Sequence, residues 1–270
     1  MDAGDKLFSG AIPQLYDSLL VPLIFAPYAE DLARRVAAER PLTVLEVAAG
    51  TGALTRAMAA RLADTSIVAT DLNPSMLDVA AGLQAGDLRI RWQQADALDL
   101  PFADEAFDVV VCQFGVMFFP DKQKAHGEAL RVLRRGGHYL FNVWDRLSRN
   151  DCPDAVMRGL AEAFPADPPL FMERTPHGYH DVGVIARDVA AVGFRDVEVE
   201  TVEKRCHGNS AAEVAMAFCQ GTPMRGEIEA RAPPDLASAT EAAARSLERR
   251  FGPGPIEGRM SAHVVSAARR

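Results

Sequence analysis

From residue 42 onward, short apolar runs alternate with segments of helical periodicity, and this alternation restricts the possible fold more than any other feature of the sequence. Runs such as LTVLEVA at 42–48 and FDVVVCQF at 107–114 are typical of strands buried on both faces. Strands that alternate with helices require crossover connections, and these place the strands parallel to one another. The sequence therefore predicts a doubly wound α/β fold, with helices on both faces of a mostly parallel sheet.

Seven strands are expected, at 42–48, 66–72, 88–95, 107–114, 138–144, 194–204 and 260–268. Pro74 is expected to begin one helix, a second helix is expected over about 121–133, and Asp181 should cap a third. The pair Gly136-Gly137 is expected to break the chain before the fifth strand.

Three segments do not follow the alternation. Residues 1–40 have an amphipathic helical pattern, 145–180 hold five prolines and no clear strand, and 207–257 contain helical stretches at about 211–219 and 235–250. Ligands of such sheets bind at the carboxyl ends of the strands, where strands five and six both end. We therefore expect residues 41–270 to form one domain with substrate-side insertions at about 145–180 and 207–257, and residues 1–40 to form a helical cap segment.

Composition excludes several classes of protein. Of the 270 residues, 49% are hydrophobic and 24% charged, as in an ordinary globular protein, and the net charge of −8 argues against nucleic acid as a partner. No apolar run reaches the roughly 20 residues that span a membrane, and the first residues do not resemble a secretory signal. The four cysteines are scattered and suggest neither disulfides nor a metal site. We expect a reduced, cytoplasmic protein that acts on a small molecule without a metal, and we allow for a homodimer.

The strand at 42–48 leads into a turn of small residues, V-L-E-V-A-A-G-T-G at 44–52. Small residues at Ala48, Gly50 and Gly52 let the backbone approach a ligand closely. A dinucleotide-binding fingerprint would require a third glycine where this chain has Thr55, and a P-loop would require Gly-Lys-Ser/Thr. The turn therefore indicates a nucleotide-like ligand but disfavours a nicotinamide dinucleotide and a nucleoside triphosphate.

Two acidic residues follow the next two strands. Asp71 ends the second strand, where its carboxylate can accept hydrogen bonds from both hydroxyls of a ribose. Its alternative role is to cap the helix at Pro74, but Asn73 suits that role better. Asp96 lies in the loop after the third strand, where it can accept a hydrogen bond from the exocyclic amine of adenine or simply stabilise the turn.

The series VLEVAAGTG, TDLNPSML, QADALDLPFADEAFDVVVCQFGVMFFPD and EALRVLRRGG resembles the class I S-adenosylmethionine-dependent methyltransferases, especially the group around the ubiquinone and menaquinone biosynthesis enzymes. The resemblance covers about residues 42–145 and implies a seven-stranded sheet with an antiparallel last strand. It also implies S-adenosylmethionine as the cofactor.

The resemblance assigns each part of that cofactor to residues of this chain. Glu46 and the backbone from Ala48 through Gly50, Thr51 and Gly52 would hold the methionine portion. Further assignments are Asp71 to the ribose, Leu72 and Met76 to the faces of the adenine, Asp96 and Ala97 to its amine, and Gln113 and Phe114 to the surroundings of the sulfonium. Ala48 stands where the family usually has glycine, which leaves less room beside the methionine.

Candidates for a catalytic role come from PHGYHD at 176–181, in the first insertion. His177, Tyr179 or His180 could contact the substrate or act as a general base there, or the loop could serve packing alone. The sequence thus predicts a methyltransferase that transfers a methyl group to a small molecule by in-line displacement. Two alternatives remain, a non-catalytic S-adenosylmethionine-binding protein and a nicotinamide-dependent oxidoreductase.

Overall fold

The computed structural model describes residues 8, 10–231 and 233–270. Part of the expected N-terminal segment, residues 1–7 and 9, lies outside this description. The sheet has seven strands in the order β3-β2-β1-β4-β5-β7-β6. Their bounds are β1 Thr43–Val47, β2 Ser66–Asp71, β3 Ile90–Gln94, β4 Phe107–Gln113, β5 Leu133–Trp144, β6 Arg195–Gly208 and β7 Ile256–Ala268.

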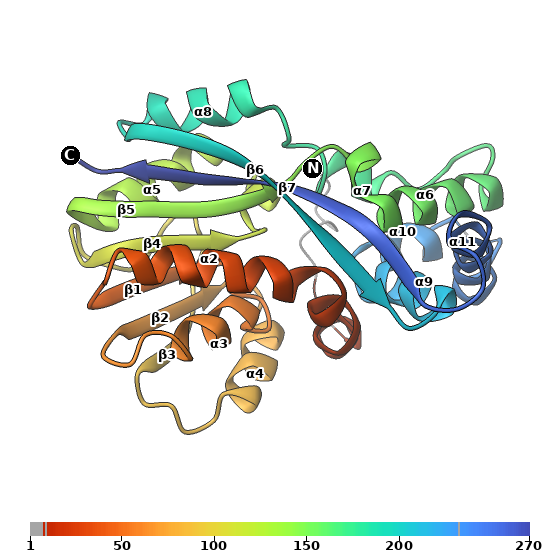
Figure 1. The fold of residues 1–270 in the computed structure, drawn as a ribbon, viewed down its shortest axis with the longest axis horizontal. Coiled ribbons are helices and arrows are strands. Elements are labelled where there is room, and N and C mark those ends of the chain that lie inside the picture. Colours follow the sequence, from red (N-terminus) through yellow and green to blue (C-terminus); the bar gives the residue numbers. More distant parts are fainter. Residues whose placement is uncertain (1–7, 9, 232) are drawn as a thin grey trace.

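Strands β1 to β5 pair in parallel, and β7 lies antiparallel between β5 and β6 (Figure 1). The predicted fold class, a doubly wound and mostly parallel seven-stranded sheet with its last strand antiparallel, is therefore confirmed. Because β6 is antiparallel to β7, it runs parallel to β5, and both strands end at the same edge of the sheet.

The pair Gly136-Gly137 does not break the chain, contrary to the sequence prediction, because β5 begins at Leu133 and runs through it. Gly136 donates to the carbonyl of Arg269, and Gly137 accepts from the amide of the same residue. A Cβ on Gly137 would lie 2.7 Å from the carbonyl oxygen of Asp108 on β4, so glycine permits a close approach of two backbones. The pair is a strand feature at an irregular register and not a turn.

Helices cover both faces of the sheet. On one face, α2 (Ala26–Ala38) and α3 (Ala53–Ala59) share a buried apolar cluster with alternate strand residues such as Val109 and Val111 of β4. On the other face, α5 (Lys122–Val132) and α8 (Val182–Ala191) share a second cluster with Val110. This alternation along one strand is what a sheet buried on both faces requires.

The helices of the two insertions gather beyond the carboxyl edge of the sheet, at the right of Figure 1. They are α6 (Asp151–Ala163), α7 (Phe171–Arg174), α9 (Ala211–Gln220), α10 (Met224–Glu229) and α11 (Leu236–Phe251), with the short helices η3 (Val116–Phe118) and η4 (Leu147–Arg149) closer to the sheet. Gly159 lets α6 approach α11 closely, because a Cβ there would lie 2.7 Å from the carbonyl oxygen of Ala242. The helical stretches expected at about 211–219 and 235–250 are present as α9 and α11, whereas α6 and α7 in the first insertion were not predicted individually.

Strands β6 and β7 are longer than the sequence predicts and leave the sheet as a two-stranded ribbon. Residues 262–268 of β7 pair with both neighbours, whereas 256–261 pair only with β6. This ribbon carries the insertion with α9, α10 and α11 beyond the edge of the sheet (Figure 1).

Several other helices begin at the proline or capping residue expected from the sequence. Helix α4 (Pro74–Leu83) begins at its proline, and the carboxylate of Asp181 accepts a hydrogen bond from the amide of Val184 at the start of α8. Asp235 caps α11 in the same way. The chain enters the fold through α1 (Ile12–Leu15) and the π-helix η2 (Tyr16–Phe25), which continues into α2.

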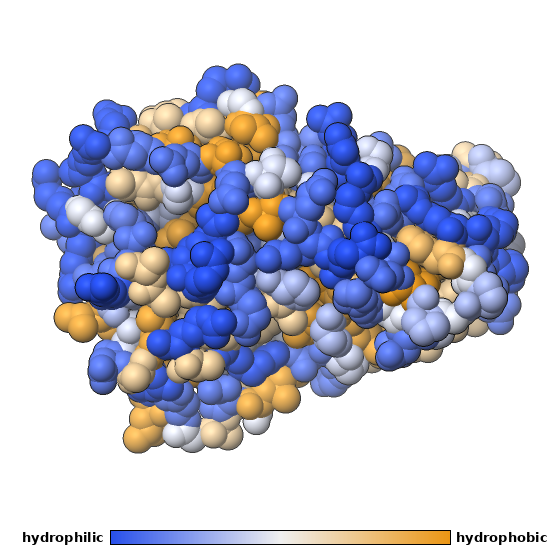
Figure 2. All heavy atoms as spheres, viewed as in Figure 1, coloured by the Kyte–Doolittle hydropathy of each residue, from blue (hydrophilic) through white to orange (hydrophobic). Residues whose placement is uncertain are grey.

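The surface seen in Figure 2 is mainly hydrophilic, with apolar side chains in small separate groups. None of the helices in the described part of the chain is long and apolar enough to cross a membrane. Buried apolar side chains form the two clusters, and apolar side chains also line a cavity at the carboxyl edge of the sheet.

Candidate functional site

A cavity of about 170 Å³ lies at the carboxyl edge of the sheet. A single water needs about 10–15 Å³ on the same measure, so the cavity has room for an organic molecule. Its wall combines the ends of β1, β2, β4 and β5 with η2, α6, α7 and α9. The strand ends, the N-terminal helices and both insertions therefore meet at one site.

The turn between β1 and α3 forms one part of the wall. Its backbone is left-handed at Ala48 (φ +56°), Gly50 (φ +57°) and Gly52 (φ +80°). A Cβ on Gly52 would lie 2.7 Å from the ring of Trp92, so this position requires glycine. Ala48 adopts a conformation that glycine would adopt with less strain.

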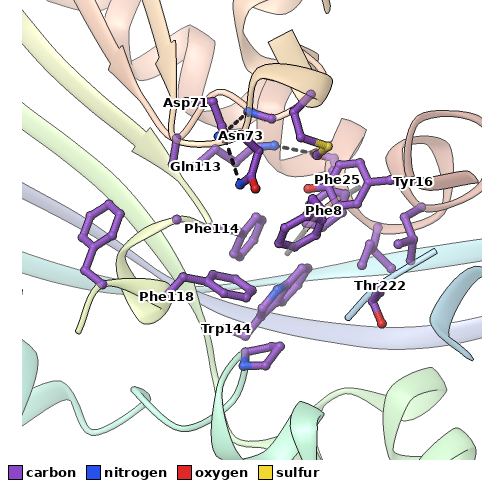
Figure 3. Close-up of a pocket in the computed structure, with 18 of the residues that line it drawn as sticks. Phe8, Tyr16, Phe25, Asp71, Asn73, Gln113, Phe114, Phe118, Trp144 and Thr222 are labelled. Carbon is purple, nitrogen blue, oxygen red and sulfur yellow. Dashed lines mark hydrogen bonds between the residues drawn. The ribbon is translucent and has the colours of Figure 1, made fainter. Parts of the chain in front are cut away.

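Asp71 ends β2 beside this turn and is buried. Its carboxylate accepts hydrogen bonds from the backbone amides of Gly50 at 2.9 Å and Asn73 at 2.8 Å (Figure 3). Burial raises the pKa of Asp71 above its usual range. The carboxylate thus joins the turn after β1 to the turn after β2, and Asp71 also lines the cavity.

Asp96 also lines the cavity but remains exposed. One of its oxygens accepts from the amide of Leu98 at 2.9 Å, so the turn-stabilising role expected as an alternative is present. Because the same carboxylate has a second oxygen, stabilising the turn is compatible with the expected contact to the adenine amine.

Gln113 and Phe114 end β4 in the middle of the wall. The Oε1 atom of Gln113 is buried without a hydrogen-bond partner among the described residues, while its Nε2 donates to the carbonyl of Phe25 at 3.5 Å. Phe114 has a left-handed backbone (φ +50°), and its ring stacks on Trp144 with the centroids 3.8 Å apart (Figure 3). Strain and an unpaired buried acceptor at one place are typical of ligand-binding positions.

Nine of the twelve residues expected at the cofactor line the cavity; they are Ala48, Gly50, Asp71, Leu72, Met76, Asp96, Ala97, Gln113 and Phe114. Glu46, Thr51 and Gly52 do not belong to the wall. Glu46 is buried below the turn and accepts a hydrogen bond from Thr55 Oγ1 at 2.5 Å, and burial raises its pKa to about 8.

The three candidate catalytic residues differ in position. His177 is buried and lines the cavity, and its Nδ1 lies 2.7 Å from the carbonyl oxygen of Asp145. Tyr179 instead donates to Asp188 of α8 at 2.9 Å, and His180 Nδ1 lies 2.7 Å from the carbonyl oxygen of His177. Neither Tyr179 nor His180 is part of the wall, so the structure brings only His177 to the site.

Sequence reasoning missed most of the aromatic wall. Tyr16 and Phe25 of η2 stack with centroids 4.9 Å apart, and Trp144 lies at the end of β5. The position of Trp144 at a strand end was a usable signal, whereas the N-terminal residues belong to no motif.

Comparisons with known proteins agree with this geometry. Residues 45–141 match the family described as a methyltransferase domain. Demethylmenaquinone methyltransferase of Clavibacter sepedonicus is 43% identical over 106 residues, which are 39% of this chain and 41% of that protein. The resemblance to class I methyltransferases is therefore confirmed over this stretch, and the match spans about two-fifths of that relative's length.

Solved structures match over most of the chain. Phosphoethanolamine N-methyltransferase 2 of Haemonchus contortus, in complex with phosphomonomethylethanolamine and S-adenosylhomocysteine, has a TM-score of 0.60 at 18% identity, covering 95% of this chain and 56% of that one. A [4+2]-cyclase has a TM-score of 0.59 at 18% identity, covering 91% and 81%. At such identities these likenesses establish the fold alone.

Proposed function

Because residues 45–141 are a methyltransferase domain on a class I fold, we propose that this chain is an S-adenosylmethionine-dependent methyltransferase. The acceptor is a small molecule, and methyl transfer proceeds by in-line displacement. The observation that carries the proposal is the cavity itself, in which the glycine turn, Asp71 and Gln113 line one continuous wall with the aromatic rings beyond β4.

The polar part of the wall fits the cofactor. Asp71 binds the ribose hydroxyls with the lone pairs that Gly50 and Asn73 leave open. Leu72 and Met76 pack against the adenine, and Asp96 with Ala97 recognises its amine.

The turn from Ala48 to Gly52 lies along the methionine portion, and Glu46 supports it from below with Thr55. Gln113 offers its unpaired Oε1, a partial negative charge, near the sulfonium, which Phe114 borders. A cavity that served packing alone would not be expected to contain a buried, unpaired acceptor such as Oε1 of Gln113.

S-adenosylmethionine supplies an activated methyl group, so the protein has to orient the acceptor and exclude water. Aromatic rings of the N-terminal helices, the β5 end and α7 enclose the cavity and leave few hydration sites. His177 is the candidate to accept a proton from the acceptor, because it is the only one of the three predicted candidates on the wall. Tyr179 and His180 hold the loop that carries it, through Asp188 and the carbonyl of His177.

The competing candidate functions have less support. A nicotinamide-dependent oxidoreductase would need a glycine at Thr55, whose hydroxyl is instead bonded to Glu46. A non-catalytic S-adenosylmethionine-binding protein would have no use for a second, aromatic half of the cavity. The fold also occurs in a [4+2]-cyclase, so reaction type must be tested and not inferred from fold.

Two measurements test the proposal. Calorimetric titration should give saturable binding of S-adenosylmethionine and S-adenosylhomocysteine and no binding of NAD. Release of S-adenosylhomocysteine should then depend on an acceptor from a panel of quinols, phenols, amines and polyketide-like compounds. Binding of NAD alone would overturn the cofactor, and cofactor binding without any acceptor-dependent turnover would favour the non-catalytic alternative.

The net charge of −8 supports a small molecule over nucleic acid as the partner. The four cysteines are buried free thiols, which supports a reducing compartment, and we propose the cytoplasm.

A further inference from the structure

The sheet order divides the cavity into two halves. Residues proposed to bind the cofactor lie at the ends of β1, β2, β3 and β4. The cavity-lining residues from Trp144 to Met260 lie beyond them, at β5, β6, β7 and the two insertions, and we call this half the acceptor chamber. All of the chamber falls outside the stretch 45–141 that matches the methyltransferase domain family.

The acceptor chamber has no charged side chain. Among the described residues that line the whole cavity, Asp71 and Asp96 are the only ones with a formal charge, and both belong to the cofactor half. A carboxylate, phosphate or ammonium group in the chamber would lose its hydration without meeting a counter-ion, which is strongly unfavourable. An aromatic cage for an ammonium is also incomplete, because Phe114 covers one face of Trp144 at 3.8 Å.

Nearly every polar side chain of the chamber is already paired within the protein. Asn150 accepts from the amide of Ser261 at 3.0 Å, and its amide group donates to backbone carbonyls, including that of Asp145 at 3.3 Å. Thr222 donates to the carbonyl of Phe218 at 2.7 Å and accepts from the amide of Met224 at 3.2 Å.

The two thiols of the chamber also contact each other. Cys152 at the start of α6 and Cys206 on β6 place their Sγ atoms 3.1 Å apart. None of these groups is therefore available to bind a polar substituent of an acceptor, which has to be recognised mainly by shape and apolar contact.

Two groups are exceptions, the indole N–H of Trp144, for which no described residue provides an acceptor, and the ring of His177. A backbone carbonyl can only accept, so the contact of Nδ1 with the carbonyl of Asp145 at 2.7 Å assigns the proton to Nδ1. Nε2 then has a lone pair, and no described residue donates to it. Burial lowers the pKa of His177 to about 4, and the neighbouring His180 also lowers it while Asp145 raises it, so the ring is neutral at physiological pH.

We propose that the acceptor chamber selects an uncharged, mainly aromatic compound whose single hydroxyl donates to Nε2 of His177. This deepens the proposed function and rests on it. The hydroxyl oxygen forms the new bond to the methyl carbon while the bond from that carbon to sulfur breaks and its electron pair stays on the sulfur. The protonated ether that results is a strong acid, so even a weak base such as His177 takes its proton. The products are the methyl ether, S-adenosylhomocysteine and one proton.

Binding of four probes with the same ring system tests the selection. They are naphthalene, 2-naphthol, 2-naphthoate and protonated 2-(aminomethyl)naphthalene, titrated into protein saturated with S-adenosylhomocysteine and followed by quenching of Trp144 fluorescence in a W92F background. We expect 2-naphthol to bind about five- to tenfold tighter than naphthalene, the effect of one hydrogen bond. Both charged probes should bind at least about tenfold more weakly than 2-naphthol.

The variant His177→Asn separates the hydrogen bond from the fold. An asparagine amide can keep donating to the carbonyl of Asp145 but has no atom at the position of Nε2. We expect H177N to bind 2-naphthol no tighter than naphthalene and to keep its affinity for naphthalene. His138→Gln in the middle of β5, at a half-buried site with an ion pair to Glu39, is the matched control and should change nothing.

The proposal is overturned if either charged probe binds as well as 2-naphthol, if H177N keeps the preference for 2-naphthol, or if no probe binds saturably. Affinity for S-adenosylhomocysteine is measured first, on the protein alone. A failure there refutes the proposed function, whereas normal affinity with the wrong probe selectivity refutes only the acceptor class.

Discussion

Replacing Asp71 with asparagine removes one negative charge at the junction of the two turns that border the cofactor half of the cavity. The carboxylate has bonds to the amides of Gly50 at 2.9 Å and Asn73 at 2.8 Å. Asparagine retains one carbonyl oxygen and can keep one of these bonds, whereas alanine would leave both amides without an acceptor. The asparagine variant is therefore the cleaner test of the ribose contact.

The expected loss follows from the bonds that disappear. A hydrogen bond to a charged group contributes about 1.5–3 kcal/mol, so losing one such contact weakens S-adenosylmethionine binding by roughly 10- to 150-fold. Asp71 is buried and water cannot replace the missing charge, which favours the upper part of this range.

Calorimetric titration of D71N and of the unchanged protein measures this loss, with thermal unfolding to verify that the variant is folded. Asp78→Asn is the matched control, because it removes the same charge from an exposed position on the neighbouring helix α4. Affinity of D71N within a factor of three of the unchanged protein would refute the ribose assignment.

Three further predictions concern stability and protons. Ala48→Gly should raise the free energy of unfolding by about 0.5–1 kcal/mol in denaturant titrations, since relief of the left-handed strain at φ +56° exceeds the entropy cost of glycine; a lower stability would contradict this. Burial lowers the pKa values of His126 and His177 to about 4, so both contribute stability above pH 6.5 that is lost as the pH falls toward 4. Urea unfolding should show a loss of about 1.4 kcal/mol per pH unit for each histidine, and His126→Phe should reduce the slope by about half; an unchanged slope would speak against burial of neutral His126. Burial raises the pKa of Glu46 to about 8, and the cationic cofactor should expel its proton, so the binding enthalpy at pH 7 should depend on the ionisation enthalpy of the buffer. Glu46→Gln should abolish that dependence, and its persistence would assign the proton to another group.

The sheet was predictable because its signals are local. Strands β1, β2 and β4 are apolar runs bounded by turn residues, and β3 has an alternating pattern. Helix α4 begins at Pro74, and Asp181 caps α8, as capping chemistry requires. The cavity wall at the strand ends follows from topology alone, which is why nine cofactor candidates lie on it.

The features that sequence could not provide depend on contacts between distant segments. The amphipathic pattern of residues 26–38 does not reveal that α2 packs on the sheet beside α3, whereas η2 lines the cavity. Gly136 and Gly137 have the composition of a turn, but the neighbouring backbone of Asp108 and the pairing with Arg269 make them part of β5.

The loop PHGYHD illustrates the same limit at the site. Its three candidate side chains are equivalent in sequence, and only the partners Asp145 and Asp188 separate them. The carbonyl of Asp145 anchors His177 on the cavity wall, while Asp188 draws Tyr179 toward α8. Such partners lie more than five residues away and have no sequence signature.

The most direct test of methyl transfer is to follow the methyl group itself. Protein, S-adenosylmethionine with an isotopically labelled methyl group and an acceptor found by the turnover panel are incubated together, and the acceptor is analysed by mass spectrometry. We predict that the label appears on the acceptor oxygen in an amount equal to the S-adenosylhomocysteine formed, and that D71N and H177N reduce both together. An acceptor that is converted without gaining the label would contradict the account.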